Sequence, residues 1–204
     1  MAPCRNLVLL GFMGTGKSAA GRRVAALTGL PFLEMDRELE RRAGKSIPRI
    51  FAEDGEEAFR RMESQLAAEW GRRRGVVIAG GGGVALRDEN LRALGRQGVL
   101  VCLTARPEII LARTSRSHHR PLLAGEDPEK KIRDLLAARA PYYAKIPVQI
   151  DTSDLDLDAL AEKLLDAWAG GHSSKKVGRG PVRPSRRRAG SRTCALPREY
   201  SWCR

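Results

Sequence analysis

The sequence predicts an α/β fold, in which a five-stranded parallel sheet lies between two layers of helices as a three-layer sandwich. Five short apolar runs alternate along the chain with segments of helical character. This alternation is typical of parallel sheets that are covered on both faces. The run at residues 99–103 is apolar throughout, as expected for a strand buried on both faces. In such sheets the ligand site lies beyond the carboxyl ends of the strands.

The strands are expected at the apolar runs, in chain order at residues 6–10, 32–35, 76–79, 99–103 and 148–150. Gly11 follows the first run, and four glycines halt the third. The crossovers that join the parallel strands should be right-handed.

Helices are expected between the strands, at residues 17–27, 56–70, 128–139 and 157–168, with one more that opens at Pro107. The segment 56–70 has a clear helical pattern, because apolar side chains recur on one side of it at Phe59, Met62, Leu66 and Trp70. Proline is tolerated at the first position of a helix, which fits Pro107.

Composition limits the classes of protein that fit this chain. Of its 204 residues, 42% are hydrophobic and 30% are charged, which suits a globular protein with a core. Nowhere do about 18 apolar residues run together without a charge, so no membrane span is expected. The first residues have no signal-peptide architecture, which makes the cytoplasm the expected location. The cysteines lack metal-ligand spacing, so neither a disulfide framework nor a zinc site is expected at Cys4, Cys102, Cys194 and Cys203.

Charge divides the chain into a domain at residues 1–169 and a basic tail at residues 170–204. The tail holds 10 of the 37 lysines and arginines but one of the 24 acidic residues. It has too few periodic apolar residues to offset the entropy of ordering, and we interpret it as disordered. The alternative is a basic arm on nucleic acid, with Tyr200 and Trp202 stacked on bases. Apart from such an arm we expect no nucleic-acid partner, and we expect a monomer.

A phosphate-binding motif follows the first strand. Residues 11–18 read Gly-Phe-Met-Gly-Thr-Gly-Lys-Ser, a full match to GxxxxGK[ST] placed between a strand and a helix. Glycines let the backbone curl around a phosphate, and successive N–H groups at a helix N-terminus form an anion nest. Lys17 should reach the β- and γ-phosphates of a nucleotide, and the Ser18 hydroxyl should bind Mg²⁺. The full match and its placement disfavour a glycine turn without a nucleotide.

The P-loop motif alone is shared by GTPases, motors and kinases. A GTPase would also need an N-K-x-D element, and Asn90 is followed by Leu91 and Arg92 instead. Motors and helicases usually need a longer chain. A compact chain with one P-loop therefore favours a kinase of a small acceptor.

Two carboxylates follow the second strand and suggest the acceptor side of the site. Glu34 and Asp36 are two positions apart, so on a strand they would share a face. They would hold Mg²⁺ through water and accept a hydrogen bond from a substrate hydroxyl, with Asp36 orienting the nucleophile. Alternatively, Asp36 caps a helix that begins near Arg37. The residues by themselves leave both interpretations open.

Several further segments, taken with the P-loop, resemble shikimate kinase. They are Glu34-Met35-Asp36, Gly44-Lys45-Ser46-Ile47, residues 50–56, residues 59–63, Gly80-Gly81-Gly82, residues 120–123 and residues 139–143. The resemblance runs in order from about residue 6 to about residue 168. It implies the P-loop fold of the nucleoside monophosphate kinases. It also implies Mg²⁺-dependent transfer of the ATP γ-phosphoryl group to the 3-hydroxyl of shikimate, which gives shikimate 3-phosphate and ADP on the chorismate route to aromatic amino acids.

The resemblance also assigns substrate-binding roles. A planar arginine fork suits the carboxylate of shikimate, and Arg60 and Arg139 match the family's carboxylate-binding arginines. Asp36 matches the residue that binds the hydroxyls and orients the attacking one. The other matching positions are the glycines Gly80, Gly81 and Gly82, of which Gly81 donates its backbone N–H, and the aromatic walls Phe51 and Phe59. Taken alone, the two phenylalanines would be interpreted as core residues.

On the nucleotide side, the matching ATP-binding residues are Gly14, Thr15, Gly16, Lys17, Ser18, Ala19, Arg113 and Arg120. A segment at about 114–127 matches a mobile lid whose closure expels water. Within it Arg120 matches an arginine that contacts the phosphates, which makes Lys17, Asp36 and Arg120 the expected catalytic residues. Arg113 matches a position that packs on adenine. The neighbouring His118 and His119 make a poor metal pair.

The chain departs from the family pattern at the expected metal ligands, which are Ser18 and Glu34. The family commonly has Asp where Glu34 stands, so the longer side chain must still reach Mg²⁺ through water. Another P-loop kinase, of gluconate or of a nucleoside monophosphate, is the alternative enzyme. The combination of Asp36, Arg60, Gly81 and Arg139 favours shikimate.

Overall fold

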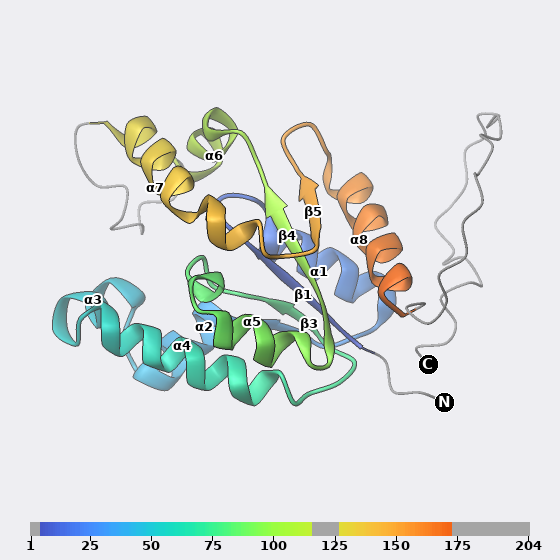
Figure 1. Cartoon of the computed structure of the whole chain (residues 1–204), viewed down its shortest axis with the longest axis horizontal. Helices are drawn as coiled ribbons and strands as arrows, with labels where there is room; N and C mark the ends of the chain where they lie inside the picture. Colours follow the sequence, from blue (N-terminus) through green and yellow to red (C-terminus); the bar gives the residue numbers. More distant parts are fainter. Residues whose placement is uncertain (1–4, 116–126, 173–204) are drawn as a thin grey trace.

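The chain forms one parallel sheet of five strands (Figure 1). The computed structural model describes residues 5–115 and 127–172. The strands lie in the order β2-β3-β1-β4-β5, and every pairing is parallel. Their bounds are β1 (Asn6–Gly11), β2 (Phe32–Glu34), β3 (Val77–Ala79), β4 (Gly98–Thr104) and β5 (Val148–Asp151). The predicted five-stranded parallel sheet is confirmed.

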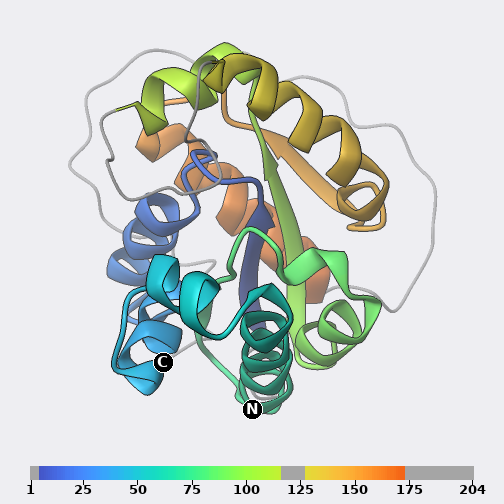
Figure 2. The same ribbon diagram turned by 90° about the vertical axis from the view of Figure 1, so that its left-hand side faces the viewer.

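Helices cover both faces of the sheet, which completes the predicted three layers (Figure 2). One face packs against α1 (Lys17–Thr28) and α8 (Leu157–His172), the other against α4 (Glu56–Trp70), α5 (Asp88–Gly95), α6 (Pro107–Thr114) and α7 (Pro128–Tyr143). Side chains alternate along β1, because successive residues of a strand point to opposite faces. Leu7 and Leu9 belong to the core beneath α1 and α8, whereas Val8 and Leu10 belong to the opposite core.

The phosphate-binding motif begins where the central strand ends. β1 pairs with β3 on one side and with β4 on the other, and Gly11 lies in register with Leu103. Gly11 has φ +128°, and a Cβ atom there would lie 2.1 Å from the Leu103 carbonyl oxygen. A side chain at this position is therefore excluded both by the backbone conformation and by the neighbouring strand.

The structure corrects several predicted boundaries. β2 ends at Glu34, and Met35 and Asp36 begin helix α2 (Met35–Ala43), so the expected strand face shared by Glu34 and Asp36 does not exist. Asp36 is not the cap of this helix either, since Glu34 holds the N-cap position. Helix α7 continues past the predicted end at residue 139, through Pro141. It does so because Tyr143 is buried and its hydroxyl donates to Gly82 O at 2.9 Å.

Short elements went unpredicted between the longer ones. They are α3 (Ile47–Glu53), α5 and a 3₁₀ turn at Val84–Leu86. Each is short, and its apolar residues are buried against several neighbours: α3 packs on α2 and α4, α5 packs on α4 and β4, and the 3₁₀ turn packs on α4, α5 and α7. Periodicity over so few positions is too weak a signal to indicate a helix.

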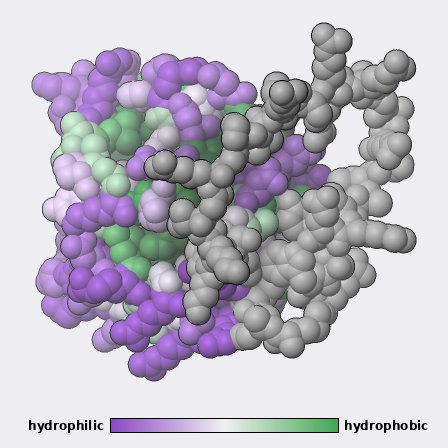
Figure 3. Space-filling view, turned by 45° about the vertical axis from the view of Figure 1, so that its right-hand side comes forward, coloured by the Kyte–Doolittle hydropathy of each residue, from purple (hydrophilic) through white to green (hydrophobic). Residues whose placement is uncertain are grey.

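The described surface is mainly polar. Hydrophilic side chains predominate at the edge of the face seen in Figure 3, with hydrophobic residues showing between them. No helix in the described part of the chain is long and apolar enough to cross a membrane. Helix α8 extends to His172, past the predicted start of the tail at residue 170, and residues 173–204 lie outside the described part.

Candidate active site

The P-loop is a tight turn that leads into α1. Gly14 and Gly16 have φ values of +75° and +93°, which a residue with a side chain rarely adopts. Thr15 is buried, and its hydroxyl donates to Phe12 O at 2.8 Å. Lys17 opens the helix, and its ammonium donates to Gly11 O at 2.9 Å and to Phe12 O at 2.7 Å. The motif thus presents backbone N–H groups, a helix N-terminus and one ammonium at a single point.

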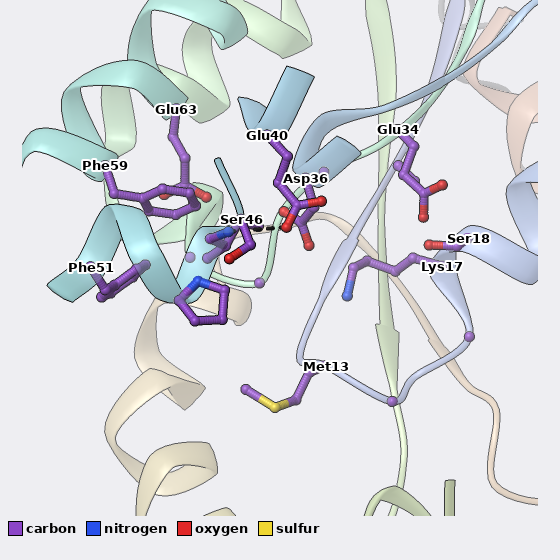
Figure 4. Close-up of a pocket in the computed structure, with 18 of the residues that line it drawn as sticks. Met13, Lys17, Ser18, Glu34, Asp36, Glu40, Ser46, Phe51, Phe59 and Glu63 are labelled. Carbon is purple, nitrogen blue, oxygen red and sulfur yellow. Dashed lines mark hydrogen bonds between the residues drawn. The ribbon is translucent and has the colours of Figure 1, made fainter. Parts of the chain in front are cut away.

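This turn forms one end of a cavity of about 640 Å³. Figure 4 shows Lys17 and Ser18 at one end, Phe51, Phe59 and Glu63 at the other, and Asp36 between them. The far end is walled by α3 and α4 and by the glycine turn after β3. Elements far apart in the sequence therefore meet in one cavity at the carboxyl ends of the strands, as parallel sheets require.

Glu34 lies beside the P-loop, with its carboxylate toward the hydroxyl of Ser18 (Figure 4). Arg22 and Arg37 both bind its Oε2 atom, at 3.2 and 3.1 Å. Among residues 5–115 and 127–172, no three His, Cys, Asp or Glu side chains gather closely enough to enclose a metal ion. Ser18 and Glu34 thus present a hydroxyl and a carboxylate at this end of the cavity.

Two carboxylates converge on the glycine turn. A Cβ atom on Gly81 would lie 2.6 Å from Glu63 Oε1 and 2.7 Å from Asp36 Oδ1. Gly81 is itself buried, while Gly80, Gly82 and Gly83 line the cavity. Within the described chain, Glu63 Oε1 is the buried side-chain oxygen or nitrogen that lacks a hydrogen-bond partner. Buried oxygens are normally hydrogen-bonded, so a ligand hydroxyl or a water would donate to this atom.

Arg60 is held by acidic side chains of its own helix. It binds Glu63 Oε2 at 2.5 Å and Glu56 Oε1 at 2.8 Å, and its guanidinium carbon lies 5.4 Å from the Phe59 ring centre and 5.9 Å from that of Phe51. Arg60 and Glu63 are almost completely buried, whereas the side chain of Glu56 is 63% exposed. Glu56 is therefore the partner that an incoming anion would displace.

Burial controls the protonation of Glu63. Loss of hydration raises the pKa of this carboxyl to about 7, against the opposing effect of Arg60. The Asp36 carboxylate raises it further, since two like charges disfavour each other. Burial by itself lowers the pKa of Arg60, but the charges of Glu63 and Glu56 and their hydrogen bonds outweigh burial and raise it, so the guanidinium stays charged. The far end of the cavity thus contains a carboxyl group that titrates near neutral pH.

Arg139 reaches the cavity from α7. It is buried, its guanidinium carbon lies 5.4 Å from the ring centre of Phe12, and its Nη1 atom donates to Gly82 O at 3.3 Å. Arg113 lines the nucleotide end from α6, where Thr152 accepts hydrogen bonds from both of its terminal nitrogens. The cavity therefore has arginines at both ends.

Comparison with known proteins identifies the group to which this cavity belongs. The sequence model of the family described as shikimate kinase matches residues 13–169. The shikimate kinase of Caldanaerobacter subterraneus subsp. tengcongensis is 44% identical over 164 residues, which cover 80% of this chain and 96% of the relative. That of Pseudomonas fluorescens is 49% identical over 142 residues, or 70% of this chain and 83% of the relative.

The chain belongs to the shikimate kinase family. Solved structures agree: a shikimate kinase from Acinetobacter baumannii in complex with shikimate superposes with a TM-score of 0.78 at 39% identity, covering 84% of this chain and 96% of that one. A gluconokinase from Sinorhizobium meliloti, with a TM-score of 0.53 at 17% identity, shares the fold, and this likeness carries nothing about the acceptor.

The structure of this shikimate kinase family member brings most of the predicted site residues into one cavity. The predicted residues that line it are Gly14, Gly16, Lys17, Ser18, Ala19, Glu34, Asp36, Phe51, Phe59, Arg60, Gly80, Gly82, Arg113 and Arg139. Thr15 and Gly81 are buried directly behind its surface. The ring centres of Phe51 and Phe59 lie 4.9 Å apart with the planes tilted by 43°. The two rings pack in the core and also form a wall of the cavity. Arg120, the histidine pair and most of the predicted lid at about 114–127 lie in residues 116–126, outside the described residues.

Sequence reasoning missed several polar residues of this family member's cavity. Glu63 ends the matching segment 59–63 and has no role assigned by the resemblance, yet its spacing of three from Arg60 on a helix indicates an ion pair. Glu40 lines the cavity and accepts the backbone N–H of Ile47 at 3.0 Å, which ties the start of α3 to α2. Thr152 lies at residues 151–156, where the resemblance places an adenine-side loop but assigns no contact, and its hydrogen-bond partners are remote in sequence.

Proposed function

We propose that this chain transfers the γ-phosphoryl group of ATP to the 3-hydroxyl of shikimate, with Mg²⁺ as cofactor. One observation carries the proposal: a single cavity is lined by the P-loop, by Asp36 and by the buried arginines Arg60 and Arg139. Within it, Asp36 lies between Lys17 at one end and Phe59 at the other (Figure 4). Phosphoryl transfer depends mainly on positioning and on stabilisation of charge, and this arrangement supplies both.

The nucleotide binds at the P-loop end. Backbone N–H groups at residues 14–19 and the N-terminus of α1 favour the phosphate oxygens. The ammonium of Lys17, which donates to two loop carbonyls, lies close enough to turn toward the β- and γ-phosphates. The family resemblance assigns Arg113 to the purine and Arg120 to the phosphates, and we propose the same roles here.

The acceptor binds at the far end. Arg139 and Arg60 hold its carboxylate, and the exposed Glu56 gives way to it. The apolar face of the ring lies against Phe51 and Phe59. Gly81 lets the substrate hydroxyls approach Asp36 and the unpartnered oxygen of Glu63, since any side chain there would fill the space between the carboxylates.

Asp36 orients the attacking hydroxyl toward the nucleotide. The hydroxyl oxygen forms a bond to the γ-phosphorus, the bond from that phosphorus to the β–γ bridging oxygen breaks, and ADP leaves. The hydroxyl proton passes to Asp36 or to water. Because the transition state is loose, Asp36 contributes more by orientation than as a strong base.

The residues beside the P-loop fit a magnesium ion. Ser18 offers a hydroxyl, and Glu34 offers Oε1 while two arginines occupy its Oε2. Mg²⁺ prefers oxygen ligands and retains several waters, so a hydroxyl from Ser18 and a water-mediated carboxylate from Glu34 would suit it. When bound, the ion neutralises charge on the β- and γ-phosphates.

The proposed kinase domain spans residues 1–169. We propose that it acts as a monomer in the cytoplasm.

A coupled ADP-release assay with shikimate, gluconate and AMP side by side tests the proposal. Turnover with shikimate well above that with the other two acceptors, and its loss when EDTA removes Mg²⁺, is the expected result. Preference for gluconate would favour the alternative kinase. Light scattering of the purified chain measures its oligomeric state.

A further inference from the structure

Thr152 occupies a junction between three elements. It follows β5 directly and is 1% exposed. Its backbone N–H donates to Thr104 O at 2.9 Å, at the end of β4. Its side-chain oxygen lies 3.0 Å from Arg113 Nη1 on α6, 3.1 Å from Thr15 O in the P-loop and 3.1 Å from Thr104 O. A buried hydroxyl thus contacts the P-loop and a cavity arginine at once.

The hydroxyl has one proton to place among these partners. Arg113 is always a donor, so the Thr152 oxygen accepts from it. The proton must then go to a carbonyl, and Thr104 O already receives the backbone N–H of Thr152. A hydrogen bond from the hydroxyl to Thr15 O therefore links Thr152 to the P-loop, whereas Thr104 is already linked to Thr152 through the backbone.

That connection sets the direction of a P-loop amide. The peptide between Thr15 and Gly16 is trans, as are all described peptides, so its C=O and N–H point in opposite directions. Drawing the Thr15 carbonyl toward buried Thr152 turns the N–H of Gly16 the other way. Gly16 lines the cavity, whereas Thr15 is fully buried. The amide is thereby presented on the cavity side, where an anion nest needs it.

The same residue fixes Arg113. Its Nη1 and Nη2 atoms donate to the hydroxyl and to the carbonyl of Thr152, at 3.0 and 2.9 Å. Two parallel bonds to one residue restrict the guanidinium plane, and the side chain is otherwise largely exposed. Arg113 is held over the nucleotide end by this contact, with a longer bond to Gly14 O at 3.4 Å.

We propose that Thr152 is a positioning residue for the nucleotide: one buried hydroxyl orients the Thr15–Gly16 peptide and clamps Arg113. The proposal rests on the nucleotide half of the proposed function and is independent of the acceptor. It predicts that loss of this hydroxyl weakens nucleotide binding and leaves acceptor binding unchanged.

Thr152→Val, which removes the hydroxyl at nearly constant volume, is the first test. Calorimetry with ADP and no acceptor should show affinity lowered about tenfold, and the KM for ATP should rise in parallel. The KM for shikimate should stay within about twofold, and Thr152→Ser should restore ADP affinity to within about twofold of the parent chain. Thr104→Val is the matched control, since the hydroxyl of Thr104 makes only a 3.5 Å contact to Ile150 O.

A purely structural role would lower the melting temperature and raise both KM values together, and that outcome would overturn the proposal. Unchanged ADP affinity in Thr152→Val, or equal defects in the Val and Ser variants, would overturn it as well. Should Thr152→Val not fold, Thr152→Cys retains a weak donor and should show a smaller loss in the same direction. The double variant with Arg113→Ala should lose less than the sum of the single losses, because the two side chains share a contact.

The outcomes separate this proposal from the proposed function. A parent chain that binds ADP but does not phosphorylate shikimate would contradict the acceptor assignment and leave the Thr152 test intact. A chain that phosphorylates shikimate with Thr152→Val at the parent's KM for ATP would contradict the role of Thr152 alone.

Discussion

The Oε2 atom of Glu63 lies 2.5 Å from Nη1 of Arg60, and both side chains are almost fully excluded from solvent. The other oxygen of Glu63 has no hydrogen-bond partner and faces Gly81 and Asp36. The pair thus satisfies one side of the carboxylate with an arginine and leaves the other side for a ligand. The cavity next to α4 therefore contains a buried carboxylate oxygen whose hydrogen bond would have to come from a ligand or a water.

This arrangement makes stability depend on pH. Burial raises the pKa of Glu63 in the folded chain from 4.5 to about 7. Between these values the folded state retains a proton that the unfolded state has released, so the free energy of unfolding falls as pH rises. The decrease attributable to Glu63 is roughly 3 kcal/mol at most. Urea unfolding between pH 4.5 and 8 should show it, and Glu63→Gln should remove it.

Exposed carboxylates cannot produce the same signal. The hydrogen bonds from Arg41 and Arg42 lower the pKa of Glu38 to about 2. Glu38 therefore affects the free energy of unfolding only below about pH 4.5, where stability rises with pH. Glu38→Gln is thus the matched control for the neutral range. A Glu63→Gln variant that retained the full slope above pH 4.5 would contradict the assigned shift.

Gly81→Ala tests the convergence of the two carboxylates. The added methyl group would lie 2.6 Å from Glu63 Oε1 and 2.7 Å from Asp36 Oδ1, both at ends of side chains that can shift. We expect the chain to fold and the KM for shikimate to rise about tenfold or more, since small displacements of positioning groups are costly. ADP affinity, measured by calorimetry, should be unchanged. Gly170→Ala, with no atom within 4 Å of the new methyl, is the control.

Asp36→Asn separates the acceptor from the nucleotide. The variant keeps the volume of the side chain but loses the negative charge that orients the hydroxyl, so kcat should fall about a hundredfold. ADP binding should change little, because the proposed phosphate-binding groups belong to the P-loop and the start of α1 and do not include Asp36. Asp134→Asn, on an exposed position of α7, provides the control for a lost surface charge. Equal losses in kcat and ADP affinity would contradict the division of the cavity.

Arg139→Lys tests the need for a planar fork. Lysine keeps the positive charge but cannot make two parallel bonds to a carboxylate, so the KM for shikimate should rise about tenfold. Arg133→Lys is the control on the same helix, since Arg133 is exposed and pairs with Glu129. Steady-state kinetics at saturating ATP measures both. An unchanged KM in Arg139→Lys would remove this side chain from carboxylate binding.

Lys17→Ala tests the P-loop directly. The γ-phosphate loses a cation held at the start of α1, so kcat should fall by about 10² to 10³ or more. Lys163→Ala, on the exposed side of α8, should retain the activity of the parent chain. Near-normal turnover in Lys17→Ala would contradict the role assigned to this motif.

Local patterns indicated most of the sheet and the nucleotide end of the cavity. Apolar runs located all five strands, because strands buried on both faces must be apolar in sequence. The P-loop could be assigned from adjacent residues because its parts are contiguous: glycines, a lysine and a hydroxyl on one turn. The start of α2 was placed wrongly, since residues 34–36 fit a strand as well as they fit the first turn of a helix.

The acceptor end depended on tertiary structure. The sequence by itself determined which residue types were available, and the family resemblance named Asp36, Arg60, Gly81 and Arg139 among them. Only the fold decided that Glu63 would be buried with one bare oxygen, and that Thr152 would reach Thr15 across 137 positions. Burial and contact between remote segments are properties of the packed chain, because they arise when separate helices and strand ends are brought to one edge of the sheet.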